Sequence, residues 1–500
     1  MSLLVRSLSR AVLTAAFATL GASAASAQFA ANGRAPDPLR SGTGAGGDLV
    51  QSAAWSGGTH STTRMQTVLG NGWAAQRTIV SADLTVGLVN NSLILNNPAQ
   101  GWNNARYQTN APKYSGVARM IMQYSATNLN PGDTRTIPAA GFICSGSLLK
   151  GGSLLTAAHC VVKQEFGQYT FPGCTPQPNL PCTVNVRYDL ANTQVQLGPR
   201  WNGVPQGQEP TGANPPFPGS PASYDQVIDV PPSATFLHPD YSGQVIDGND
   251  VAVLNLPVAA APMFQQYQIS NVSAVGQDVN IAGWGGRTNG DPATSFASVG
   301  LNLPNGFFWV PGGAGARRRQ GMNTFDFLAS DPDMFPLFGP SPGVQSYAIY
   351  MTDFDNGRAS QDASCVMYKA LGGTGREAQF CDLGLGLDEV NTAGGDSGGP
   401  SFYNGLITSV TSFGITFGGA CLGGPDIDQP AGPEPLTCPN DFWFALNSSF
   451  GEMSGYSALF ANTSWLIQTA GRQAVVPEPG TVILMGSGLI ALVAARRRMR

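Results

Sequence analysis

The sequence predicts an all-β protein, built as one elaborated domain with processed ends. Strand-like apolar runs recur in the middle of the chain, at residues 141–149, 251–256 and 280–285. Glycine and proline together supply 100 of the 500 residues, which favours turns and loops but stays below the level typical of wholesale disorder. The length exceeds that of an ordinary domain, although β-barrels and sandwiches of about 200 to 250 residues commonly form one domain.

Charge and cysteine content exclude several classes of function. A formal net charge of -5 provides no basic surface for nucleic acid, and no nucleic-acid-binding motif is present. The eight cysteines favour disulfides over metal ligands, because the chain begins with an export signal. Three histidines and the lack of a Cys-x-x-Cys pair make a zinc site unsupported. We therefore expect no cofactor and no metal.

The amino-terminal end has the pattern of a signal peptide. Arg6 and Arg10 precede an apolar run over 11–22, and Ala25-Ser26-Ala27 fits the small-residue rule for signal peptidase. We expect residues 1–27 to be removed, so that the mature chain starts near Gln28.

The carboxyl-terminal end combines three blocks: Pro477-Glu478-Pro479, an apolar stretch over 481–495, and a run of arginines. Fifteen residues are short for a transmembrane helix, but bilayer thinning and snorkelling arginines can compensate. The basic end should stay cytoplasmic. Residues 476–500 resemble the PEP-CTERM sorting signal of Gram-negative bacteria. This resemblance implies processing by an exosortase, with membrane retention followed by surface delivery or release; a permanent anchor is the alternative.

Three motifs point to nucleophilic catalysis. Ser397 lies in the glycine-rich loop 394–400, His159 follows Thr156-Ala157-Ala158, and Asp250 begins an apolar run. A serine hydroxyl is a poor nucleophile unless a neighbouring base activates it and donors stabilise the oxyanion that it creates. The chain order His, Asp, Ser is one of the known orders of such a triad.

On these motifs, residues from about 116 to 470 resemble a trypsin-like, chymotrypsin-fold serine peptidase. The resemblance implies two six-stranded antiparallel β-barrels with long loop insertions and a C-terminal helix, over residues 114–472. It also implies acyl transfer, in which Ser397 attacks, His159 is the general base and Asp250 orients the imidazole. The backbone N–H groups of Gly395 and Ser397 would form the oxyanion hole. Activity should fall on acidification below the ordinary imidazole pKa.

The resemblance also assigns a specificity pocket. Asn391, six residues before the nucleophile, stands where trypsins carry an aspartate, while Gly414 and Ser454 would line the pocket walls. An uncharged amide cannot form the ion pair that selects arginine or lysine, so we expect a polar, neutral pocket. Ser412 would support Asp250.

The family pattern implies the disulfides Cys144–Cys160 and Cys365–Cys381, of which the first, closing a loop of sixteen residues, should contribute about 3 kcal/mol. Cys174 and Cys182 lie in one insertion and are expected to pair locally. The chain departs from the family at Ala393, where trypsins carry a cysteine, so Cys421 is expected to pair with Cys438, the nearest candidate. Trypsin-like enzymes usually mature by a cut whose new amino terminus pairs with the aspartate before the nucleophile, here Asp396. The usual Ile-Val-Gly-Gly start is absent. A cut after Lys113 and an internal donor to Asp396 both stay open.

Two long segments carry no clear chemistry. Residues 28–113 are expected to form a pro-segment or a weakly structured extension. The insertion 286–364 contains Arg317-Arg318-Arg319, interpreted as a solvated loop charge run in preference to a processing site or an anion-binding patch. Asp353, Asp355 and Asp362 are candidate calcium ligands, but their spacing lacks a complete loop signature.

The sequence therefore predicts an exported serine endopeptidase that acts on peptides or proteins. Its partners would be signal peptidase and an exosortase-type enzyme, and its location the cell surface or the medium after membrane retention. The alternatives are an inactive trypsin-fold binding protein at the surface and an esterase that uses the same triad.

Overall fold

The computed structural model describes the central part of the chain, within one compact unit, Ser41–Arg500. The described residues are 49–52, 65–69, 73–78 and 112–476, with gaps at 138–139, 172–180, 202–203, 206–223, 286, 289–306, 309–317, 339–347, 356, 387–388, 393–394, 418–426 and 428–449. The predicted signal peptide and the predicted transmembrane stretch 481–495 lie outside these residues. Within them, no helix has the length and apolar character needed to cross a bilayer.

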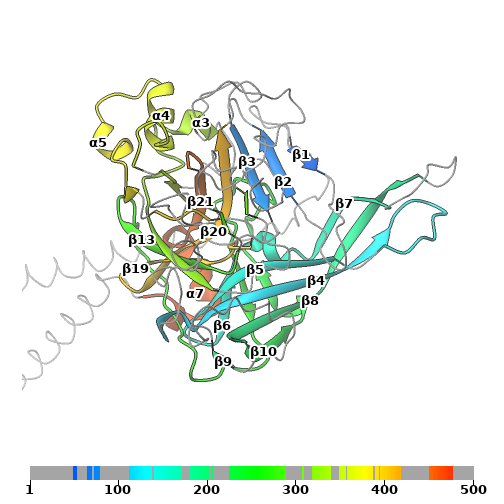
Figure 1. Cartoon of the computed structure of the whole chain (residues 1–500). Helices are drawn as coiled ribbons and strands as arrows, with labels where there is room; N and C mark the ends of the chain where they lie inside the picture. The colour runs from blue at the N-terminus through cyan, green and yellow to red at the C-terminus, as the bar shows by residue number, and fades with distance from the viewer. Residues whose placement is uncertain are drawn as a thin grey trace, which may run out of the picture. The chain divides into compact units, whose positions relative to one another are not determined.

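The first sheet is antiparallel and has nine strands within the described residues, in the order β10-β8-β4-β5-β6-β12-β11, with β7 and β9 paired to β8 (Figure 1). Its strands are β4 (Val117–Asn128), β5 (Ala140–Leu148), β6 (Ser153–Thr156), β7 (Gln164–Thr170), β8 (Thr183–Trp201), β9 (Val204–Pro205), β10 (Tyr224–Val230), β11 (Thr235–Leu237) and β12 (Ala252–Asn255).

Alternating polarity explains how the first sheet encloses a core. Along the second half of β4, Met122 and Tyr124 are buried while Gln123 and Ser125 are exposed. This alternation is the pattern of a strand with one face toward the core and one face toward solvent. Met120 and Met122 pack with Leu154, Val195 and other apolar side chains in one core cluster. A register shift at Gln123/Tyr124 bends β4 where it pairs with β8, which curls the sheet.

The second sheet is also antiparallel and has ten strands within the described residues. Its main order is β1-β2-β3-β20-β19-β13-β16; β21 joins β20 to β18, and β18 pairs with β17. Its strands are β1 (Leu49–Ser52), β2 (Met65–Leu69), β3 (Trp73–Thr78), β13 (Asp278–Gly283), β16 (Arg319–Thr324), β17 (Phe327–Leu328), β18 (Ile349–Asp353), β19 (Pro400–Tyr403), β20 (Leu406–Phe417) and β21 (Met453–Ala458), with β14 (Arg287–Thr288) and β15 (Phe307–Phe308) forming a separate hairpin.

The helices are short, and the most C-terminal α-helix closes the described fold. The α-helices are α3 (Phe335–Phe338), α4 (Ala363–Ala370), α5 (Glu377–Phe380) and α7 (Thr463–Ala470), and the 3₁₀ helices are η2 (Pro112–Tyr114), η3 (Ala158–Val161), η5 (Pro232–Ala234), η9 (Leu459–Asn462) and η10 (Arg472–Ala474). The predicted fold class is confirmed: two curled antiparallel sheets, few helices and a C-terminal helix.

Within the described residues, each sheet contains more strands than the six per barrel that the resemblance implies. In the second sheet the reason is the segment before residue 113, because β3 pairs with residues 414–417 of β20 and brings β1 and β2 with it. Part of the predicted extension thus joins the sheet. In the first sheet, β7 and β9 pair along the nineteen-residue β8, which is long enough to carry extra partners.

The two sheets meet over a shared apolar cluster. Val117 and Leu155 from the first sheet, Val253 from β12, and Trp284 and Val410 from the second pack together there. The indole N–H of Trp284 donates to the carbonyl of Val117 at 3.1 Å, so the largest buried side chain also ties the sheets by a hydrogen bond.

The arginine run is not solvated where the structure describes it. Arg318 is 5% exposed and Arg319 1% exposed, which makes the prediction of a solvated loop charge run wrong for these two residues. Burial lowers the pKa of Arg318 to about 10, and its Nη1 donates to the carbonyl of Val117 at 3.4 Å beside the ring of Trp284. The local charge pattern gave no sign of this, because β16 is drawn inward by its pairing with β13.

Candidate active site

The register of β6 and β12 places an aspartate beside a histidine. Ala252 lies opposite Thr156 in this antiparallel pair, so the residues just before β12 and just after β6 meet at the same end. Asp250 Oδ2 lies 2.6 Å from His159 Nδ1, and Asp250 Oδ1 accepts the backbone N–H of His159 at 2.8 Å. A carboxylate can only accept, so Nδ1 carries the hydrogen and Nε2 is left as the acceptor.

A third donor reaches the same carboxylate from the second sheet. The hydroxyl of Ser412 donates to Asp250 Oδ2 at 2.5 Å. Ser412 lies in β20 where the pairing with β21 shifts register between Thr411 and Phe413, and such a bulge re-aims a side chain. Asp250 is fully buried, so these hydrogen bonds act in a low-dielectric environment.

The histidine turn is braced covalently. His159 lies in η3, and its neighbour Cys160 forms a disulfide with Cys144 of β5. Tyr124 donates to the carbonyls of Cys160 and Val162, at 3.4 and 2.8 Å, which holds the turn from the other side.

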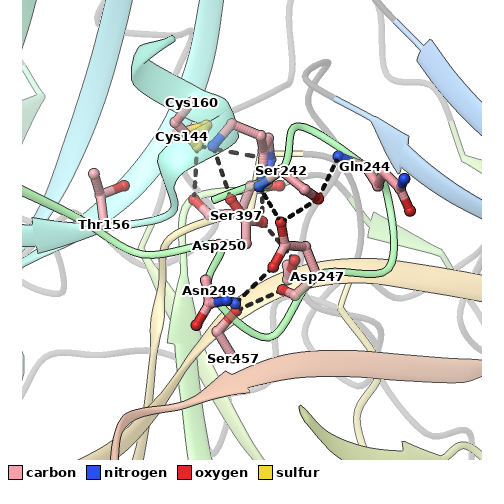
Figure 2. Close-up of polar contacts among 12 residues, drawn as sticks. Cys144, Thr156, Cys160, Ser242, Gln244, Asp247, Asn249, Asp250, Ser397 and Ser457 are labelled. Atoms are coloured by element: carbon pink, nitrogen blue, oxygen red, sulfur yellow. Dashed lines mark hydrogen bonds and ion pairs between the residues drawn. A yellow bond between two sulfur atoms is a disulfide. The ribbon is translucent and has the colours of Figure 1, made fainter. Parts of the chain in front are cut away.

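Ser397 lies against this histidine turn, just before β19. Its carbonyl accepts the N–H of Ser145 at 2.8 Å, and the same oxygen lies 3.7 Å from Sγ of Cys160. A Cβ on Gly398 would stand 2.1 Å from the hydroxyl oxygen of Thr156, so only glycine allows the loop to pack this closely. Figure 2 draws Ser397, Asp250, Cys144 and Cys160 in one close-up of this region.

The residues around the nucleophile position are held from the first sheet as well. Gly395 has a φ of 99°, a left-handed conformation that favours glycine, and its carbonyl accepts the hydroxyl of Ser145 at 2.9 Å. Asp396 is fully buried, and its Oδ1 accepts the backbone N–H of Gly285 at 2.8 Å. An internal backbone donor therefore contacts the Asp396 carboxylate, one of the two arrangements that the sequence left open.

Sequence reasoning missed Asp247, which organises the loop that presents Asp250. Its Oδ2 accepts both the N–H and the hydroxyl of Ser242 at 2.6 Å, and its Oδ1 accepts the N–H of Asn249 at 2.8 Å (Figure 2). Its carbonyl accepts the N–H of Asp250 at 3.2 Å. The signal that could have found it is the Asp-Gly-Asn sequence at 247–249, because an aspartate followed by glycine and asparagine favours an Asx turn.

The three predicted pocket residues lie together. Gly414 of β20 is directly opposite Ser454 of β21, and the hydroxyl of Ser454 donates to Oδ1 of Asn391. Asn391 is fully buried, and its side-chain Nδ2 has no hydrogen-bond partner among the described residues. Thr392 completes the group through a 2.7 Å contact between its hydroxyl and that of Ser454. The lining is polar and uncharged at these positions.

Three of the six remaining cysteines lie within the described residues. Cys365 and Cys381 form a disulfide, and Cys182 is disulfide-bonded. Cys174, Cys421 and Cys438 lie outside the described residues. The His238 ring packs edge to face on Trp465 at 4.9 Å between ring centres, and its backbone N–H donates to the carbonyl of Val251 at 2.9 Å. Burial lowers the pKa of His238 to about 4, with nearby Asp240 opposing this effect, so the imidazole is neutral at physiological pH.

Comparisons with known proteins place one motif in this chain. Residues 475–498 match the PEP-CTERM protein-sorting motif, which confirms the predicted sorting signal. This motif indicates export in a Gram-negative bacterium and processing by an exosortase. No curated protein sequence matches the chain. A solved structure of mouse neuropsin, described as a serine protease expressed in the limbic system of the brain, is 16% identical; the match covers 73% of this chain and 98% of that one, with a TM-score of 0.33.

Proposed function

We propose that this chain is an exported serine endopeptidase whose catalytic residues are His159, Asp250 and Ser397. The observation that carries the proposal is the buried Asp250 carboxylate, which accepts hydrogen bonds from His159 Nδ1, the His159 backbone and Ser412. This arrangement fixes the tautomer that a general base requires. The loop of Ser397 packs on the same histidine turn, which supports the choice of nucleophile.

The proposed reaction is acyl transfer to water. Nε2 of His159 takes the proton of Ser397 Oγ as that oxygen attacks the substrate carbonyl, and Asp250 stabilises the imidazolium that forms. The N–H groups of Gly395 and Ser397 stabilise the oxyanion, a contribution of about 3 kcal/mol per donor. His159 then donates its proton to the leaving amine, and water activated by the same imidazole hydrolyses the acyl-enzyme.

The same proposal divides the chain by role. Residues 114–472 form the peptidase, 28–113 an extension or pro-segment, and 476–500 the sorting signal, with residues 481–495 in the membrane before processing. After processing, the enzyme works at the cell surface or in the medium on peptide or protein substrates. The neutral pocket at Asn391, Gly414 and Ser454 disfavours cleavage after arginine or lysine.

A fluorophosphonate probe tests the proposed chemistry. We expect covalent labelling of the exported protein at Ser397, loss of labelling in Ser397→Ala, and strong loss in His159→Ala. Ser233→Ala, which changes an exposed serine of η5, is the matched control and should label normally. A folded protein that is not labelled would support an inactive binding protein instead.

Paired substrates test the reaction class. Peptide and ester substrates that carry the same acyl group share the acyl-enzyme, so a peptidase should hydrolyse both. Hydrolysis of the ester alone would reject the endopeptidase proposal in favour of an esterase.

A further inference from the structure

A group of buried carboxylates lies around the end of β18 in the second sheet. All are at most 5% exposed, and they come from four separate segments of the chain. The group consists of Asp326, Asp353, Asp355, Asp362 and Glu389. The sequence indicates three of the five, Asp353, Asp355 and Asp362, as part of an incomplete calcium pattern, but it indicates neither Asp326 nor Glu389.

Three members of the group lie close enough to share one ion. Asp353, Asp355 and Glu389 each offer an oxygen within 4.8 Å of the other two. Two oxygens on opposite sides of Ca²⁺, each at about 2.3–2.6 Å from the ion, are separated by a similar distance. Within the described part of the chain, the two other clusters of potential ligands contain disulfide-bonded cysteines, which are not available to a metal.

Backbone N–H groups donate hydrogen bonds to Glu389 and Asp355, but one carboxylate oxygen of Asp355 accepts none from the described residues. Glu389 accepts the N–H of Leu385 at 2.8 Å and the N–H of Asp355 at 3.0 Å, one on each oxygen. Asp355 Oδ1 accepts the N–H of Gly357 at 2.6 Å. Asp355 Oδ2 has no hydrogen-bond partner among the described residues, although Asp355 is 0% exposed. A buried carboxylate oxygen without a partner is costly unless a cation meets it.

Among the residues that the structure describes, no positively charged side chain forms an ion pair with the group. Burial raises the pKa of Asp362, and Lys369 opposes this effect without reversing it. Burial raises the pKa of Asp355 to about 7, and further acidic neighbours push in the same direction. The carboxylates therefore lack the counter-charge that buried carboxylates normally have.

From this geometry we infer that Asp353, Asp355 and Glu389 bind one calcium ion. Carboxylate oxygens are the ligands that hard divalent cations take, and the cluster offers no nitrogen or free sulfur for a softer metal. Calcium fits better than magnesium because Mg²⁺ retains its water shell, whereas these ligands are buried. Of the proposed ligands, Asp355 would be stabilised most by the ion, because its Oδ2 has no hydrogen-bond partner among the described residues.

The position of the site connects the ion to the proposed pocket. Glu389 precedes Asn391 by two residues, and Asn323 donates both to the carbonyl of Asp353 at 2.7 Å and to that of Val390 at 2.9 Å. Thr352, next to Asp353, lies opposite Ser454 of the pocket. Calcium at this place would hold the pocket segment against β18; this part of the inference rests on the proposed peptidase function.

Direct binding measurements test the site without any use of activity. The full exported chain with Ser397→Ala is stripped with a chelator and titrated with CaCl₂ by calorimetry, up to about 10 mM, above the range typical of extracellular calcium sites. We expect one ion per chain and a rise in the thermal unfolding midpoint, with a weaker effect of MgCl₂. Asp355→Asn in the same background should weaken calcium binding more than tenfold, while Asp240→Asn, an exposed carboxylate, should bind like its parent.

A second readout separates a ligand from a merely structural residue. In chelator, Asp355→Asn should unfold at the same temperature as its parent or higher, because it removes an unmatched buried carboxylate. The inference is overturned if the parent shows neither binding heat nor a midpoint shift, or if folded Asp355→Asn binds calcium as the parent does; should this variant not fold, the parent titration decides. Calcium binding without any Ser397 labelling in the active-site-intact chain would count against the peptidase, not against the site.

Discussion

At the scale of single residues, one carboxylate gathers the groups on which the proposed chemistry depends. Asp250 takes hydrogen bonds from the side chain and backbone of His159 and from Ser412. His159, Asp250 and Ser397 were predictable because each stands in a short local motif. Asp247 was not, because its role depends on how the loop 242–249 folds back on itself.

Replacement of Asp250 by asparagine tests the role of its charge. Asp250→Asn keeps the volume but offers an amide N–H₂ where the imidazole needs an acceptor, so His159 is expected to adopt the wrong tautomer. We expect kcat to fall by about 10⁴-fold, as in the aspartate-to-asparagine change of a known triad. Peptide hydrolysis measures this, with Asp240→Asn as the control, and a loss below tenfold would contradict the role assigned to Asp250.

A charge at the pocket base should change selectivity. Asn391→Asp places a carboxylate beside Ser454 in an otherwise neutral lining. We expect kcat/KM for substrates with arginine or lysine before the cleaved bond to rise by about tenfold or more relative to neutral substrates, which corresponds to 1.4 kcal/mol. A peptide library profiled with parent and variant measures the ratio. Asn255→Asp, an exposed change on β12, should leave the profile unchanged, and an unchanged profile for Asn391→Asp would remove Asn391 from the pocket.

At the scale of elements, strand pairing brings the distant motifs together. The pairing of β6 with β12 sets Asp250 beside His159, and the bulge in β20 turns Ser412 toward both. The sequence indicated β12 through its apolar run over 251–256. The sequence did not indicate β3, because its residues contain no apolar run of strand length. β3 forms through its pairing with Gly414 to Phe417 of β20, which is distant in the chain.

The pairing of β3 predicts that the extension limits access to the cleft. β3 runs antiparallel to β20, and beyond Gln76, which is opposite Gly414, it continues toward the level of Ser412. An extended peptide substrate that adds as a strand to this edge would compete with it. Removal of residues 28–78 should therefore raise kcat/KM for peptides, by roughly tenfold if the competing strand contributes about 1.4 kcal/mol.

Two comparisons make this result specific. Removal of residues 28–48 alone leaves all three strands and should leave peptide hydrolysis unchanged. Fluorophosphonate labelling should be equal in all forms, because a small probe does not need the strand edge. Equal peptide hydrolysis by the chain that lacks residues 28–78 would show that β3 does not compete with the substrate.

At the scale of the whole molecule, the sequence predicted the class of fold but not the distribution of buried charge. Local apolar periodicity indicates strands, and motif order indicates how they assemble. Arg318, Arg319 and the carboxylates around Asp355 look solvated in the sequence, since charged residues in a glycine-rich and proline-rich insertion usually are. They are buried because β16 and β18 join the second sheet through partners distant in the chain.

His238 makes the stability of the whole chain depend on pH. Burial lowers its folded-state pKa to about 4, whereas the unfolded value is about 6.5, so the unfolded chain binds more protons below that pH. The contribution is complete above about pH 6.5 and is lost as the pH falls toward 4, at a total of about 3 kcal/mol.

Urea unfolding of parent and His238→Asn, both with Ser397→Ala, isolates this contribution between pH 6.5 and 4. The asparagine oxygen can accept the N–H of Asp240, as Nδ1 does at 3.2 Å, but it does not titrate. The variant should lose less free energy of unfolding over this range by about 3 kcal/mol. Parallel pH curves for the two proteins would show that His238 is protonated in the folded state.

The turn at Lys113 restricts the access of a protease to the peptide bond after this residue. The carbonyl of Lys113 accepts the hydroxyl of Tyr267 at 2.8 Å, and the next side chain, Tyr114, is buried with its hydroxyl on Asn280 at 2.6 Å. A peptide bond must adopt an extended conformation to enter the active site of another protease. The bond after Lys113 lies instead in the 3₁₀ helix η2, and the residue on each side of it forms one of these hydrogen bonds. A protease that cuts after Lys113 would therefore have to act before this turn folds.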